Sequence, residues 1–110
     1  MTTPEPPPSS SLVLYQSEDG RTRVQCRFED ETIWLTQAQM AELFQVAVST
    51  VNEHVKGVYG DAEVAQETTL RKFRIVRFEG TREVARLVDH YSLPVILAVG
   101  YRVRSPRGTQ

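Results

Sequence analysis

The residues best suited to chemistry fall in one short segment, whose side chains can contact the edges of DNA bases. They are Val48, Ser49, Thr50, Asn52 and Glu53. The amide of Asn52 can pair with adenine, the carboxylate of Glu53 can accept from the amino group of cytosine, and Val48 can touch a thymine methyl. Ser49 and Thr50 are equally suited to capping a helix, and the two roles are compatible. The segment predicts a base-reading surface.

Side chains suited to phosphate groups occur in two further places. They are Thr36, Gln37 and Lys56 around the first segment, and Lys72, Arg74, Arg77 and Arg82 farther along the chain. Contacts of this kind position a protein on DNA without reading its sequence. Because the first group contains a single basic residue, the second group must supply most of the counterion release on DNA binding.

Charge is distributed unevenly along the chain. Up to Glu67 the sequence holds eleven of its 14 acidic residues but only four of its 13 basic ones, so the remainder is rich in arginine. Such an asymmetry can attract an anionic partner to one part of the surface. Two arginine-rich strands with solvated faces produce the same distribution, so charge alone does not decide between these readings.

Residues that would indicate an enzyme or a metal protein are isolated from suitable partners. Neither His54 nor His90 has a cysteine or histidine at metal-ligand spacing, and each is expected at the surface or partly buried. Asp89 and His90 are neighbours on a predicted strand, so their side chains point to opposite faces. Ser49 lacks the motif of an activated nucleophile. We therefore expect no catalytic site, cofactor, metal or small-molecule substrate.

A helix is predicted from the residues that start it. Thr36 and Gln39 fit a capping box, in which the hydroxyl accepts from the N–H of Gln39 and the Gln39 side chain reaches back. Leu35 and Met40 stand at the positions of a hydrophobic staple. The helix is expected to run from residue 37 to Phe44.

A second helix follows a break at residues 45–47. Val48, Val51 and Val55 recur at steps of three and four residues, and Gly57 or Gly60 suits the end of this helix. Two short helices separated by about three residues match the DNA-binding helix-turn-helix.

Several positions in this helix pair test the motif. The small residue at the helix crossing would be Ala41, and the buried positions are Met40, Phe44, Val46 and Val51. Gln45 stands where the motif usually has glycine, which makes the match less specific, although glutamine can occupy the left-handed region at some cost. An ordinary helical hairpin that only packs is the alternative.

The flanking segments predict strands. Residues 12–15 and 23–28 form a plausible hairpin across a turn at Gly20, and residues 33–35 form a third short strand. Residues 71–78 and 83–91 form a second hairpin around a glycine-containing turn at 79–82.

Two further helices are expected on either side of that hairpin. Asp61 can cap a short helix at residues 62–67. Ser92 can cap a last, mostly apolar helix that has Pro94 in its first turn.

Composition limits the chain to one domain. Apolar residues make up 40% and charged residues 25% of the 110 residues, which is typical of a globular protein. Residues 1–11 are rich in proline and serine and are predicted to be a disordered tail, followed by one domain over residues 12–110. No run reaches the ~18–20 apolar residues of a membrane span, and no secretory signal is evident. Cys26, the single cysteine, is expected to fill the core, and a cytoplasmic location is predicted.

Long stretches of the sequence resemble the RhuM family of bacterial virulence-associated proteins. The most specific are HYSLPVILAVGYRVRSPRGTQ at residues 90–110 and IWLTQAQMAELF at residues 33–44. Residues 15–20 and 73–91 are similar to the same family. Pro94 departs from the pattern, because the family commonly has aspartate there.

The resemblance implies a bacterial protein often described as DNA-binding or virulence-associated. It also implies that the family continues beyond this C-terminus with a mostly helical region, so the chain is expected to be truncated.

Together these patterns predict an α+β, winged-helix-like domain. Its parts are a helix-turn-helix, an N-terminal β-hairpin, and a second hairpin whose tip at 79–83 is the wing, before a C-terminal helix. The expected function is binding of duplex DNA, as part of a transcriptional regulator or a mobile-element protein. The alternative is a protein-interaction module that docks a partner, a second copy, or another part of a longer RhuM-like protein; a remnant without function is a third reading. The operator, the regulated genes and the oligomeric state do not follow from the sequence.

Overall fold

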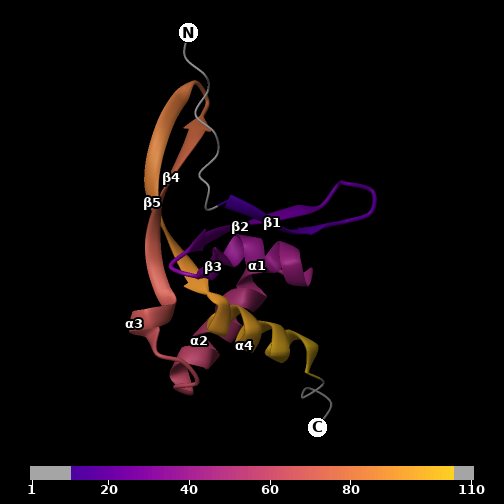
Figure 1. Ribbon diagram of the computed structural model, residues 1–110, viewed down its shortest axis with the longest axis vertical. Coiled ribbons are helices and arrows are strands. Elements are labelled where there is room, and N and C mark those ends of the chain that lie inside the picture. Colours follow the sequence, from indigo (N-terminus) through magenta and orange to yellow (C-terminus); the bar gives the residue numbers. More distant parts are fainter. Residues whose placement is uncertain (1–10, 106–110) are drawn as a thin grey trace.

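The computed structural model describes residues 11–105 (Figure 1). Most of the predicted tail, residues 1–11, lies outside the described residues. Its last residue does not: Ser11 begins the first strand, β1 (Ser11–Gln16), so the domain starts one residue earlier than predicted.

The strands form one antiparallel sheet in the order β1-β2-β3-β5-β4. After β1 come β2 (Arg23–Glu29), β3 (Thr32–Leu35), β4 (Leu70–Glu79) and β5 (Arg82–Ser92). The described helices are α1 (Gln37–Phe44), α2 (Val48–Gly60), α3 (Gln66–Thr69) and α4 (Leu93–Arg104). The predicted α+β class is confirmed in this form, as are both hairpins.

The core lies between one face of the sheet and the helices α1, α2 and α4. The sheet contributes Val24, Cys26, Leu35 and Tyr91, and the helices contribute Met40, Ala41, Val51, Val55, Val58, Val95, Ile96 and Val99. The removal of this apolar surface from water is the main force that holds the layers together. Cys26 is buried among these residues, as predicted.

An aromatic cluster covers the opposite face of the sheet. The ring of Phe73 packs edge-on against Trp34, with centroids 5.6 Å apart, and against His90 at 4.9 Å. The guanidinium groups of Arg27 and Arg71 lie over this cluster, 4.4 Å from the Phe73 ring and 4.5 Å from the Trp34 ring respectively. His90 is only 3% exposed, so the prediction of a surface or partly buried side chain was wrong for this residue. The aromatic neighbours that bury it come from other strands.

The β4–β5 hairpin projects beyond the rest of the sheet. Its ladder is regular over ten pairs, from Leu70↔Tyr91 to Glu79↔Arg82. In contrast, β3 pairs with β5 only at Ser92 and Tyr91. The remainder of the hairpin therefore continues as a two-stranded ribbon that curves away from the helices (Figure 1). We call residues 74–87 the arm.

The predicted third helix is misplaced. Helix α2 continues to Gly60, Ala62 takes a positive φ of 56°, and α3 begins only at Gln66. The carboxylate of Asp61 does not cap a helix but accepts from Arg102 Nη2 at 2.8 Å. A partner on α4, distant in the sequence, therefore determines the conformation after α2.

Candidate nucleic-acid interface

The start of α1 has the capping geometry that the sequence predicts. Thr36 Oγ1 accepts from the backbone N–H of Gln39 at 3.1 Å, and Gln39 Oε1 accepts from the backbone N–H of Thr36 at 2.9 Å. Thr36 is buried. Its hydroxyl stabilises the helix start, and because the residue is buried it is less accessible to a phosphate group than the sequence suggested.

Residues 45–47 connect α1 to α2 through a left-handed residue. Gln45 has φ 59° and ψ 50°, as its place in the motif requires, and its backbone N–H donates to the carbonyl of Ala41. Its side-chain Nε2 also donates to the carbonyl of Glu42, at 2.6 Å. These contacts satisfy carbonyl groups that the end of a helix would otherwise leave unpaired.

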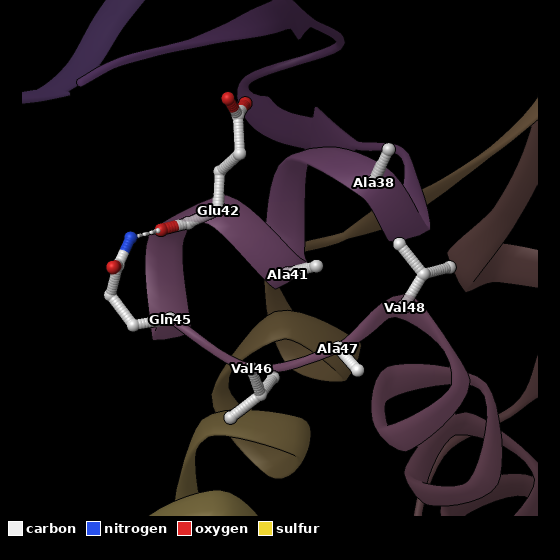
Figure 2. A pocket seen from close by; sticks show the side chains of 7 residues that line it. All are labelled: Ala38, Ala41, Glu42, Gln45, Val46, Ala47 and Val48. Carbon is white, nitrogen blue, oxygen red and sulfur yellow. Dashed lines mark hydrogen bonds between the residues drawn. The ribbon is translucent and has the colours of Figure 1, made fainter. Parts of the chain in front are cut away.

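A shallow hollow of about 710 Å³ lies over this connection (Figure 2). It is lined by five small or apolar side chains, Ala38, Ala41, Val46, Ala47 and Val48, and by the polar Glu42 and Gln45. The Glu42 carboxylate extends away from the hollow, whereas Ala38 and Val48 lie near each other across it (Figure 2). Ala41 is buried at the place predicted for the helix crossing, so the two helices approach closely there.

The predicted base-reading residues lie along α2. Val48, Ser49 and Glu53 are exposed, whereas Thr50 and Asn52 are half-buried. Val48 is 48% exposed at the first position of the helix.

A hydrogen-bond network ties α2 to α1 and the sheet. Gln37 Nε2 donates to Asn52 Oδ1 and to the Tyr91 hydroxyl, both at 3.2 Å. Burial raises the pKa of Tyr91, so its phenol keeps its proton. The network orients the Asn52 amide, which the sequence alone did not reveal.

A second hollow, of about 270 Å³, joins the start of α1 to the arm. It is lined by Thr36, Gln37, Ala38, Arg77, Val88, Asp89 and Tyr91. Gln37 and Arg77 are forty residues apart in the sequence. The fold brings these two predicted phosphate contacts to one surface, because β5 returns from the arm beside the start of α1.

The predicted basic residues of the hairpin differ in their neighbours. Lys72 Nζ donates to Asp89 Oδ1 at 2.6 Å, and this contact raises the pKa of Lys72. Among the described residues, the exposed Arg74, Arg77 and Arg82 take part in no ion pair. These three cations are therefore available to an anionic partner, whereas the charge of Lys72 is already balanced.

Arg82 stands apart from the other predicted contacts. It lies opposite Glu79 in the last cross-strand backbone pair of the ladder, at the tip of the arm and far from the helices (Figure 1). Arg86, which the sequence reading did not select, forms a two-pronged ion pair with Glu79, with the shortest N···O distance at 2.9 Å. No local sequence signal marks this pair, because it depends on the strand register.

Between residues 11 and 105, no group of three or more His, Cys, Asp or Glu side chains is placed to hold a metal ion. None of the helices in that range has the length and apolar character that a membrane span requires.

Comparisons with known proteins identify a family for the C-terminal part. The family model described as Virulence protein RhuM family matches residues 68–110. The chain matches no curated protein and no solved structure. The matched segment covers β4, β5 and α4, so it includes the whole arm. Residues 68–110 are therefore similar to the RhuM family, and the resemblance predicted from the sequence is confirmed for that segment.

Proposed function

We propose that this protein binds duplex DNA through the α1–α2 helix pair and the basic arm, and that it does so without catalysing a reaction. The observation that carries the proposal is the hollow shared by Gln37 and Arg77. In a DNA-binding helix-turn-helix, the second helix enters the major groove and adjacent elements hold the phosphate backbone. Here α2 corresponds to the reading helix, and the arm lies beside the start of α1, the helix that precedes α2.

The exposed residues of α2 supply the contacts to bases. Val48, Ser49 and Glu53 lie at its N-terminal half, where a reading helix contacts base edges. Asn52 is held by Gln37, so its amide is presented in a defined orientation. Preorganised polar groups lose less entropy on binding than mobile ones.

Phosphate contacts come mainly from the arm. Lys56 is exposed on α2, and Arg74, Arg77 and Arg82 are exposed on β4 and β5. Each phosphate neutralised on duplex DNA contributes roughly 0.9 to the slope of log affinity against log salt. The arm should thus dominate the salt dependence, while α2 supplies discrimination between sequences.

The test measures fluorescence anisotropy of a labelled random duplex at several salt concentrations. Arg77→Ala should weaken binding and make the salt slope shallower by about one. Arg104→Ala is the matched control, since Arg104 is an exposed basic residue at the end of α4, remote from the arm (Figure 1). Absence of binding at low salt by a folded sample, or equal losses in the two variants, would contradict the proposal.

A second candidate function is association through α4 with a second copy of the chain. An apolar groove of about 610 Å³ runs along α4 and is lined mainly by residues of β1, α1 and α4. On α4 its exposed members Leu93, Leu97 and Tyr101 recur every four residues. This stripe is symmetric about Leu97, so two antiparallel copies of α4 would place Leu97 against itself.

Cross-linking tests this second candidate directly. Leu97→Cys should form a covalent dimer on oxidation, because a residue on a two-fold axis meets its own copy. Ser49→Cys, also exposed but on α2, should remain monomeric. A monomeric wild-type protein in sedimentation at high concentration would contradict self-association.

A further inference from the structure

One face of the arm carries exposed apolar side chains. Val76, Phe78 and Leu87 are 50%, 74% and 66% exposed. Val76 pairs with Ala85, Phe78 with Glu83, and Leu87 with Arg74, so all three apolar side chains project from the same face of the ribbon. Contiguous exposed apolar surface of this kind usually marks a binding site.

Phe78 is the apolar residue nearest the tip. Glu79 and Arg82 form the last pair of the ladder, and only Gly80 and Thr81 connect them. Gly80 has φ +69°, as expected where the first residue of a two-residue hairpin turn is glycine, and no atom lies within 4 Å of the position that a Cβ would occupy. The end of the arm is thus narrow, and it presents an aromatic ring beside its turn.

Charges around the ring favour an anionic partner over an apolar protein surface. Arg86 holds Glu79 in a two-pronged ion pair, so the charge of this acid is balanced. Among the described residues near the tip, Arg74, Arg77 and Arg82 remain without an ion pair, against Glu83 alone. Arg74 and Glu83 share the face of Phe78, whereas Arg77 and Arg82 project from the opposite face of the narrow ribbon. Apolar side chains on an arm with an excess of unpaired arginines suit a partner with charged edges and an apolar interior.

Duplex DNA has this combination, because phosphates border each groove and the stacked bases are apolar. We propose that the tip of the arm enters the minor groove and that Phe78 inserts between two base pairs, which bends the DNA. The inference rests on the proposed DNA-binding function and adds a mechanical role to it. Apolar side chains that wedge between base pairs partly unstack them and kink the duplex by roughly 20–90°.

The dimensions of the arm fit this role. Five residue steps separate Arg74 from Glu79, so the part of β4 in the arm spans about 17 Å. A helical turn of DNA is about 34 Å and holds one major and one minor groove, so neighbouring grooves lie about 17 Å apart along the axis, which is within the length of the arm. The strands of the arm are about 4.8 Å apart, so the ribbon with its side chains is wider than an undistorted minor groove, whose width is roughly 6 Å. Entry therefore requires the groove to open, which a kink at the wedged step provides.

The experiment combines three readouts on one duplex. Anisotropy reports binding, energy transfer between dyes at the two ends reports bending, and a 2-aminopurine at a central TA step reports unstacking. Pyrimidine–purine steps such as TA are the easiest to kink. Wild-type protein should raise both the energy transfer and the 2-aminopurine fluorescence, and it should bind this duplex about tenfold more tightly than a stiff A-tract duplex.

Three variants identify the wedge. Phe78→Ser should abolish the energy-transfer and fluorescence changes and reduce the tenfold preference to about one. Phe78→Leu should retain both changes, because leucine is also an effective wedge. Leu87→Ser is the control, since Leu87 has similar exposure on the same face but lies farther from the tip; whatever its effect on affinity, the saturated complex should keep both the energy-transfer and the fluorescence changes. Circular dichroism confirms that each variant is folded.

The outcomes separate this inference from the proposed function. Binding by wild-type protein without bending or unstacking overturns the wedge and leaves DNA binding intact. Equal effects of Phe78→Ser and Leu87→Ser also overturn it, because they assign the whole apolar face to another partner. No binding by the folded wild type overturns the proposed function and the wedge with it.

Discussion

Trp34 and Phe78 are both aromatic residues on strands, yet they lie in regions held together in different ways. Trp34 is 2% exposed, packs edge-on against Phe73, and donates its indole N–H to the carbonyl of Glu29 at 3.1 Å. Phe78 is 74% exposed on the arm. The body of the protein is stabilised by burial in two layers, whereas the arm is held by its backbone ladder and side chains that remain in water.

This difference suits the two regions to different tasks. A two-stranded ribbon without a covered face is marginally stable alone, so the body must anchor the arm at its base. The exposed ion pairs Lys72–Asp89 and Arg86–Glu79 add little stability, because water screens them. The side chains of the arm can therefore change with small effects on folding, which leaves them available for binding.

The sharpest test of this contrast replaces the two aromatic residues in turn. Trp34→Ala should lower the free energy of unfolding by about 3–5 kcal/mol, because it removes a large buried ring. Phe78→Ala should change it by less than about 0.5 kcal/mol, as is usual for an exposed site. Urea denaturation followed by circular dichroism measures both. Similar losses would show that the arm is packed in solution.

Two glycines extend the comparison to the helices. A Cβ on Gly100 of α4 would lie 2.9 Å from Phe44 Cζ, whereas one on Gly60 of α2 meets no atom within 4 Å. Gly100→Ala should therefore lower the free energy of unfolding by about 1–3 kcal/mol through overpacking. Gly60→Ala should raise it by about 0.4–1 kcal/mol, because it restricts the unfolded chain. Thermal denaturation distinguishes the two signs, and a neutral Gly100→Ala would show that α1 and α4 pack loosely.

The connection between α1 and α2 provides a smaller effect. Gln45 occupies the left-handed region, which costs a residue with a side chain roughly 1 kcal/mol. Gln45→Gly should therefore stabilise the protein by about 0.5–1 kcal/mol. Ala47, with φ −71° and ψ 152°, is the control, and Ala47→Gly should destabilise by a similar amount. A shift of the urea midpoint in the same direction for both glycine variants would contradict this prediction.

The last prediction concerns pH and the aromatic cluster. Burial lowers the pKa of His90 from its ordinary 6.5, while Nδ1 lies 2.8 Å from the carbonyl oxygen of Val88. As the pH falls, the His90 imidazole of the unfolded chain therefore takes up a proton at a higher pH than that of the folded protein does. The contribution of His90 to the free energy of unfolding should be constant above about pH 6.5 and should decrease as the pH falls below that value. Urea denaturation between pH 5 and 7.5 measures the slope, which should be shallower in His90→Gln; an unchanged slope would assign it to other groups.

Local features of the fold were predictable because they depend on neighbours in the chain. The capping box at Thr36, the left-handed Gln45 and the turn at Gly80 each involve residues at most three positions apart. Strand periodicity likewise placed both hairpins. The third helix was misplaced because Asp61 pairs with Arg102, and no local rule anticipates a partner on another helix.

The features of the candidate site were likewise predictable from the sequence only in part. Residue types and spacing indicated the exposed positions of α2 and the arginines of the arm. Burial of the Thr36 hydroxyl and the balanced charge of Lys72 could not be inferred, because both depend on which segments pack together.

The sequence by itself determined the approximate places of both hairpins and of α1, α2 and α4, which faces are apolar, and that basic residues concentrate after Glu67. Only the tertiary structure placed Gln37 beside Arg77, buried His90 against Phe73, and left Phe78 uncovered near the tip of the arm. The reason is physical: periodicity and capping act over one or two turns of chain. Sheet order, register and the end of pairing between β3 and β5 depend on contacts between residues far apart in the sequence.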